Sequence, residues 1–216
     1  MNIRSIKATN FPSRVHLEFD SGLILPLIAD DVVTLKLSKG QELNDDLFKQ
    51  IVFKSIYYML RNSAMIQINN SPKTEKLLYQ KLSISLQKIT NKYDYPKGIL
   101  DYSGVIKQLC SDLKSKGLLD DADFTQFFVR KNHSKSRRQI EYLLQSAGVD
   151  RQVINKYLLV GSSQKEEVLK ILTKKNVSVS NLKDFSFKNK LTASFYRKGF
   201  TLSDIKAAFD DLVNNG

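Results

Sequence analysis

The chain has 216 residues, 42% of them hydrophobic, and carries 34 Lys and Arg against 22 Asp and Glu, a formal charge of +12. This length and apolar fraction argue against a disordered chain and allow one large domain or two small ones. One cysteine excludes an internal disulfide, and no segment is long and apolar enough to span a membrane. Cys110 lies on an apolar helical face, where we expect it to be buried, and we expect a cytoplasmic protein.

Positive charge is distributed unevenly along the chain. Residues 1–50 hold six basic and seven acidic side chains, so the whole excess of positive charge lies after residue 50. A basic region of this kind favours an anionic partner, either a nucleic acid or the acidic surface of another protein.

The first 45 residues are predicted to form a small β-rich module. Arg14–Phe19 alternates polar and apolar residues, the pattern of a half-buried strand. A turn at Asp20–Gly22 and the apolar run Leu23–Leu25 complete a hairpin-like unit. Pro26 cannot donate a ladder hydrogen bond, so the second strand is expected to end there or to lie at a sheet edge. His16 falls on the polar side of the alternation, where we expect a solvated side chain.

From residue 46 onward, apolar residues recur with the 3.6-residue period of helices. Ser71 followed by Pro72 has the form of a helix start. Loops are expected at Asn91–Gly98 and at Asn176–Asn181 because apolar periodicity is lost there. The predicted organisation is a β-rich module at 1–45, followed by three-helix repeats at 46–120 (with an insertion near 83–96), 121–160 and 161–216.

The second and third repeats match each other at a constant spacing. Six pairs of apolar residues or glycines lie 51 positions apart: Ile140 and Leu191, Leu144 and Phe195, Gly148 and Gly199, Val149 and Phe200, Ile154 and Ile205, Leu158 and Phe209. An internal repeat of this length indicates helical units stacked in series. We therefore predict a mainly α fold of three tandem three-helix repeats in an elongated, curved array, with a small β-rich N-terminal module. One irregular all-α domain is the alternative.

The stretch Gly117–Arg130 ends one predicted helix and forms the next. Gly117 follows an apolar helical face and suits the left-handed position that stops a helix. Asp120 or Asp121 then has the form of an N-cap. A helix predicted at about 121–131 leads into Asn132–Arg138, a basic connection without an acidic residue.

Motifs of enzymes are weak throughout the sequence. It contains no His-Glu-x-x-His, no Gly-x-Ser-x-Gly and no phosphate-binding glycine-rich loop that ends in Lys-Ser or Lys-Thr. Gly161–Lys165 lacks the flanking strand and the second glycine of such a loop, and is interpreted as a linker and helix cap. We expect a protein that is not an enzyme and that needs no cofactor and no metal.

Basic residues are the best candidates for a binding surface. Arginine suits bidentate contact with phosphate or carboxylate, and lysine supplies a point charge. The candidates follow the predicted helix at 121–131, a loop in the third repeat, and the step before Gly199: Arg130, Lys131, Lys135, Arg137, Arg138, Lys174, Lys175, Arg197 and Lys198. Ordinary solvated charges are the alternative interpretation.

Three aromatic residues near these cations, Tyr142, Phe187 and Tyr196, are of a type that can stack on nucleic-acid bases. Aromatic residues at helical spacing are more often part of a core. We therefore leave them out of the predicted site.

The central stretch also carries a resemblance to a known family. Gly-Leu-Leu-Asp-Asp at 117–121, an acid-flanked alanine, paired aromatic residues and Val129-Arg130 resemble the signature of RecX proteins, the bacterial regulators of the RecA recombinase. Leu23–Leu27 is similar to the family's β-rich opening, and Arg197–Phe200 to its recurring basic-basic-glycine-aromatic step. Ser71–Leu82 resembles a helix that usually has an arginine-rich entry, where this chain has Asn70-Ser71-Pro72.

The resemblance implies a regulator that binds RecA–DNA filaments along their groove and restrains ATP hydrolysis, strand exchange and filament growth. Its partners would be the RecA filament and single- or double-stranded DNA, and we expect a monomer with no membrane partner. A standalone nucleic-acid-binding module is the main alternative, because binding led by phosphate contacts needs no recombinase and weakens steeply with salt. A scaffold for other acidic partners is a third interpretation.

Overall fold

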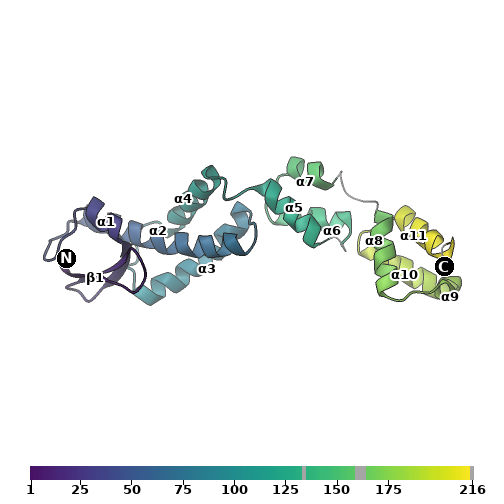
Figure 1. Ribbon diagram of the computed structural model, residues 1–216, viewed down its shortest axis with the longest axis horizontal. Coiled ribbons are helices and arrows are strands. Elements are labelled where there is room, and N and C mark those ends of the chain that lie inside the picture. The colour runs from purple at the N-terminus through teal and green to yellow at the C-terminus, as the bar shows by residue number, and fades with distance from the viewer. Residues whose placement is uncertain (133–134, 159–163, 215–216) are drawn as a thin grey trace. The chain divides into compact units, whose positions relative to one another are not determined.

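The computed structural model describes residues 1–132, 135–158 and 164–214. The chain is mainly α-helical, with one small antiparallel sheet near its N-terminus, and it forms two compact units, residues 1–119 and residues 120–216 (Figure 1). Gly161–Ser163 of the predicted linker, and His133 and Ser134 of the predicted basic connection, lie outside the described residues. Across the described ranges, no helix has the length and apolarity needed to cross a bilayer.

The sheet has three antiparallel strands in the order β1-β2-β3: β1 Ile3–Ala8, β2 Arg14–Phe19 and β3 Ile24–Ile28. β2 confirms the predicted strand. β3 continues past Pro26 but lies at an edge of the sheet, which is one of the two positions expected for this proline. β1 was not predicted. Its pairing with β2 shifts between Ile3 and Ser5, and this bulge breaks the period-2 pattern that marks a regular strand.

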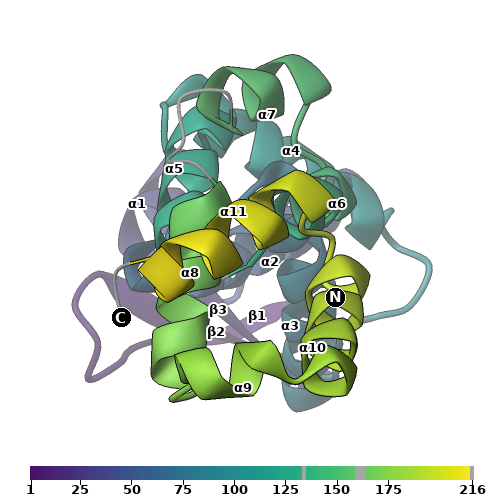
Figure 2. The ribbon, with the colours of Figure 1, turned by 90° about the vertical axis from the view of Figure 1, so that its right-hand side faces the viewer.

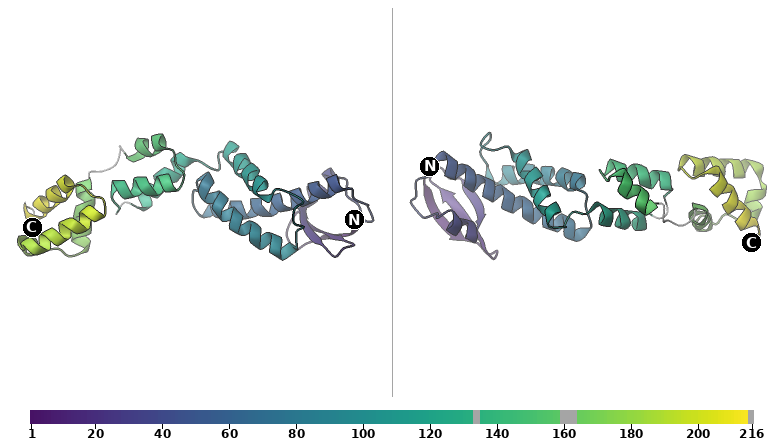
Figure 3. Two further views of the ribbon diagram at one scale, coloured as in Figure 1. Left: turned by 180° about the vertical axis from the view of Figure 1, so that it is seen from behind. Right: turned by 90° about the horizontal axis from the view of Figure 1, so that it is seen from above.

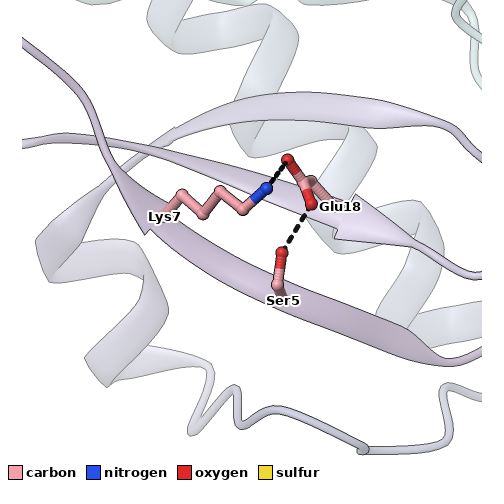
Figure 4. A network of polar contacts seen from close by, with 3 residues as sticks. All are labelled: Ser5, Lys7 and Glu18. Atoms are coloured by element: carbon pink, nitrogen blue, oxygen red, sulfur yellow. Dashed lines mark hydrogen bonds and ion pairs between the residues drawn. The ribbon is translucent and has the colours of Figure 1, made fainter.

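Polar contacts join β1 to β2 on the solvent side of the sheet (Figure 4). Lys7 Nζ and Ser5 Oγ each donate to a different carboxylate oxygen of Glu18, at 2.7 Å in both cases. Both hydrogen bonds hold the pKa of Glu18 below its usual value, and the one from Lys7 has the larger effect. These contacts add side-chain hydrogen bonds to the backbone pairing of the two strands.

The helices of the first unit are α1 Ala29–Thr34, α2 Asp45–Asn70, α3 Glu75–Tyr93 and α4 Tyr102–Ser115. The predicted start of α3 at Pro72 is wrong. Ser71 has extended backbone after α2, and the helix begins three residues later, where the Thr74 side chain accepts from the Leu77 N–H. Most of the segment near 83–96 forms the second half of α3.

A single apolar core runs through the first unit, from the sheet to the helices. α2 begins against the sheet and extends beyond it, with α3 and α4 packed alongside (Figure 3). Within the core, Ser55 Oγ donates to the Pro26 carbonyl oxygen at 2.6 Å and contacts the Tyr95 hydroxyl. Cys110 is buried as predicted, and burial raises the pKa of its thiol to about 11.

His16 is not fully solvated, contrary to our expectation. Its ring lies edge-on to Tyr93 at the end of α3, with ring centroids 6.4 Å apart. Its Nε2 is buried without a hydrogen-bond partner in the described structure. Burial lowers the pKa of the imidazole, and the neighbouring Arg14 lowers it further. The alternation along β2 was interpreted correctly, but α3 covers part of its polar face.

In the described part of the second unit, all the regular elements are helices: α5 Asp121–Lys131, α6 Arg137–Ser146, α7 Arg151–Leu158, α8 Gln164–Lys174, α9 Val179–Lys183, α10 Phe185–Arg197 and α11 Leu202–Asn214. The expected loop at Asn176–Asn181 is partly wrong, because Ser178 and Asn181 form a capping box that starts α9. α11 packs on α8 around an apolar cluster that includes Phe195, Phe200 and Phe209 (Figure 2).

Positions 51 residues apart adopt the same geometry. Gly148 and Gly199 have φ angles of +90° and +89°, in the left-handed region that favours glycine. Each glycine ends its helix, and in each case the N–H of the next residue bonds a carbonyl five positions back: Val149 to Leu144, and Phe200 to Phe195. This is the Schellman arrangement. Equivalent sequence positions therefore stop α6 and α10 in the same way.

Candidate nucleic-acid and protein interface

The cations predicted near residue 130 lie at the end of α5 and the start of α6. Arg130 and Lys131 are in the last turn of α5, where positive charge complements the helix dipole. Lys135 is half-buried before α6, and Arg137 and Arg138 are exposed in the first turn of that helix. Part of this cluster thus surrounds the entry to α6.

Ser136 connects that entry to the end of α10. Its Oγ accepts from the Gln139 N–H at 3.3 Å, which caps α6, and donates to the Lys198 carbonyl oxygen at 2.5 Å. The Arg137 N–H donates to Gln164 Oε1 at 3.1 Å, which adds the start of α8 to the same place. We call the surface formed by the start of α6 and the end of α10 the α6–α10 junction (Figure 2).

Gly199 allows this close approach. A Cβ atom at this position would lie 2.7 Å from Ser136 Oγ and 3.3 Å from Arg138 Cβ. Both distances are too short for an ordinary contact, and φ at Gly199 also favours glycine. The glycine is therefore required both by the backbone of α10 and by the packing of α6 against it.

A hollow of about 450 Å³ lies at the α6–α10 junction. Seven of the described residues line it: Arg138, Gln139, Tyr142, Tyr196, Arg197, Lys198 and Gly199. Three of these carry positive charge and none is acidic. The structure thus brings together predicted cations from two clusters that are about 60 residues apart in the sequence.

A second hollow, of about 620 Å³, shares Arg138 and Tyr196 with the first. It differs in charge, because Glu141 and Asp204 line it together with Arg137 and Arg138. Paired charges of both signs attract a polyanion less than the acid-free lining of the first hollow. The 450 Å³ hollow is therefore the stronger candidate site.

Comparison with known proteins gives consistent relatives. No protein-family model matches the chain. Regulatory protein RecX of Clostridioides difficile (strain 630) is 24% identical over 206 residues, which cover 93% of this chain and 90% of the relative. Regulatory protein RecX of Clostridium botulinum (strain Eklund 17B / Type B) is 26% identical, over 93% of this chain and 91% of the relative. The protein of the same name from Streptococcus pneumoniae serotype 19F is 23% identical, covering 91% and 72%.

Over most of its length the chain is similar to proteins named Regulatory protein RecX. Its fold is similar to a crystal structure of regulatory protein RecX, with a TM-score of 0.64 at 18% identity over 97% of this chain and 98% of that one. It is also similar to the crystal structure of RecX from Lactobacillus salivarius, with a TM-score of 0.53 at 19% identity over 73% and 96%.

The segment Arg197–Phe200, which carries part of the RecX resemblance, now has a structural explanation. Arg197 and Lys198 line the 450 Å³ hollow, Gly199 ends α10 against Ser136, and Phe200 is buried in the apolar cluster of α8–α11. The segment thus combines two cations at the hollow, a glycine that ends the helix and an aromatic residue that anchors the chain in the core.

Lys174 and Lys175 are exposed but lie at the other end of α8 from the junction. Gln164, at the start of α8, bonds Arg137, and Lys174 is ten residues further along the helix. At a rise of about 1.5 Å per residue, the two ends are about 15 Å apart. The structure therefore does not group this pair of lysines with the cations of the hollow.

Two exposed tyrosines that were not among the predicted site residues lie at the junction. Tyr142 and Tyr196 are 69% and 60% exposed, so the expectation that such aromatic residues belong to a core is wrong for both. Their positions relative to the apolar stripes of α6 and α10 could have indicated this. The exposed lysines of α3, Lys81, Lys88 and Lys92, also share one helical face through their spacings of seven and four.

Proposed function

We propose that this chain binds RecA–DNA filaments and restrains RecA, lowering ATP hydrolysis, strand exchange and filament growth. The observation that carries the proposal is the acid-free hollow at the α6–α10 junction, where Arg138, Arg197 and Lys198 lie together. The relatives that bear the name Regulatory protein RecX support it.

The chemistry of the junction suits a nucleoprotein filament. Such a filament presents phosphates and protein carboxylates, and arginine can contact either of them with two parallel hydrogen bonds. The three cations come from two helices whose relative position is fixed by Ser136 and Gly199. Binding groups that are already in place lose less conformational entropy when the partner arrives.

DNA-dependent ATP hydrolysis by the RecA of the same organism tests this proposal. Wild-type protein is expected to inhibit hydrolysis at well below one molecule per RecA. A variant with Arg138, Arg197 and Lys198 changed to Ala is expected to need at least about tenfold more protein, since each lost charged contact weakens binding. The matched control changes three exposed lysines away from the junction, Lys174, Lys175 and Lys183, to Ala.

The control variant has the same net charge as the junction variant, so it separates a local contact from general electrostatic attraction. Equal loss of inhibition in both variants would contradict a site at the junction. No inhibition by the wild-type protein at any ratio would contradict the proposed function. Inhibition only at amounts that coat the DNA would favour a standalone nucleic-acid-binding protein, the second function that the basic surface supports.

A further inference from the structure

We propose that the 450 Å³ hollow at the α6–α10 junction holds unpaired nucleotides of single-stranded DNA. In this proposal the bases stack on Tyr142 and Tyr196, and the phosphates lie against Arg138, Arg197 and Lys198. The inference rests on the proposed function, since it assigns a specific ligand to the same surface.

The two tyrosines are the first reason. Tyr142 is 69% exposed and Tyr196 is 60% exposed, and both line the same hollow. Other residues of the same two helices, Ile140, Leu144 and Phe195, are buried and form the core contacts of these helices. The ring faces of the tyrosines are therefore available to a ligand, and every nucleobase offers a flat face of matching chemistry.

The arrangement of charge around the rings is the second reason. Arg138 and Tyr142 are four residues apart on α6 and so share one face of the helix. Tyr196 is followed directly by Arg197 and Lys198 at the end of α10. Both tyrosines and all three cations line the same hollow, so a base on a ring and a phosphate on a cation can be bound at one site.

The absence of acidic residues from the lining favours a polyanion over a peptide of mixed charge. A duplex is a poor fit, because its bases are stacked on each other and their faces are covered. A single strand presents both phosphates and free base faces. The neighbouring hollow is lined by one of the two tyrosines and by the acidic residues Glu141 and Asp204. We therefore assign the nucleotides to the hollow that contains Tyr142.

Direct binding measurements test the inference without RecA. Fluorescence anisotropy of a labelled oligothymidylate of about 16 nucleotides, within the range of known single-strand sites, would give the affinity of each variant. Changing both Tyr142 and Tyr196 to Ala is expected to weaken binding by about tenfold or more. Changing both to Phe keeps the ring faces and is expected to retain the affinity.

Phe185→Ala is the matched control, because Phe185 is 78% exposed on the same helix as Tyr196 but does not line the hollow. Its affinity should equal that of the wild type. The chain has nine tyrosines and no tryptophan, so stacking should also quench tyrosine emission directly. An abasic oligonucleotide of equal length should bind more weakly than the oligothymidylate and cause less quenching.

Unchanged affinity of the Tyr142→Ala, Tyr196→Ala variant would overturn the inference, as would equal binding of the abasic strand. Equal loss in the Phe variant would also overturn it, since that result indicates hydroxyl contacts in place of stacking. The RecA assay on the same variants keeps the two proposals apart. Inhibition that survives in the Ala variant leaves the RecA proposal intact whatever the DNA result, and failure of the wild type to inhibit does not alter the oligonucleotide measurement.

Discussion

The two compact units carry the same charge but differ in how their interiors are built. Residues 1–119 and residues 120–216 each contain 17 Lys and Arg and 11 Asp and Glu, so each accounts for half of the formal +12. The first unit has one continuous apolar core that extends from β1 to the end of α4. In the second unit, α8–α11 have a small core of their own, and polar contacts at Ser136 and Arg137 join α6 to the ends of α10 and α8.

This difference shows that net charge alone does not locate a binding surface. The basic residues of the first unit include exposed lysines spread along α3. In the second unit, two helix ends meet, and their cations surround a hollow with exposed tyrosines. At the junction the ends of α6 and α10 meet through a polar contact, so cations from two helices lie together, whereas the α3 lysines come from one helix.

The largest expected effect tests the continuous core. Ile56 is fully buried in α2, so Ile56→Ala should lower the free energy of unfolding of the first unit by about 2–5 kcal/mol, through lost burial and a cavity. Val33→Ala, at a position 76% exposed, is the control and should change it by less than about 0.5 kcal/mol. Urea unfolding would measure the loss of stability, and hydrogen exchange would show which helices lose protection. Equal loss of protection in α10 and α11 would contradict separate cores.

An intermediate effect tests the polar junction. Gly199→Ala should destabilise the second unit by at least about 1–2 kcal/mol, because alanine is strained at φ +89° and its Cβ would meet Ser136 Oγ. Gly98→Ala is the control, with a φ of +79° but open space around the site, so it should show the backbone strain alone. Urea unfolding gives both values.

A double variant sharpens the same measurement. Ser136→Ala removes the oxygen that the new methyl group would meet, so the combined change with Gly199→Ala should cost less than the sum of the two single changes. Simple additivity would mean that Ser136 and Gly199 do not constrain each other.

The smallest expected effect concerns pH and belongs to the first unit. The pKa of His16 is lowered in the folded state by burial and by Arg14, so the unfolded chain binds the proton more readily. The stability that His16 contributes is therefore present above about pH 6.5, the ordinary histidine pKa, and is lost as the pH falls below it. Urea midpoints at pH 7.5 and 5.5 should differ more for the wild type than for His16→Gln. The same difference in both proteins would contradict this assignment.

The predicted boundaries at residues 45, 120 and 160 divide the chain into a β-rich module and three helical repeats, and this division remains a prediction. The elements themselves were predicted well where local signals are strong. β2 at Arg14–Phe19 and α5 at Asp121–Lys131 have the predicted bounds, because alternation and an aspartate cap are local features. β1 and α9 were missed, since a bulge hides the first and the second is only five residues long.

By itself, the sequence determined the helical class, the 51-residue spacing, the glycines that end α6 and α10, and the cations as candidates. All of these depend on residues that are near one another in the chain or on a repeated pattern. Only the tertiary structure decided which cations lie together, because the Ser136–Lys198 contact joins residues 62 positions apart. It also decided that Tyr142 and Tyr196 face solvent at one hollow and that Lys174 lies away from it. Periodicity identifies the buried face of each helix, but the packing of one helix on another determines which exposed residues become neighbours.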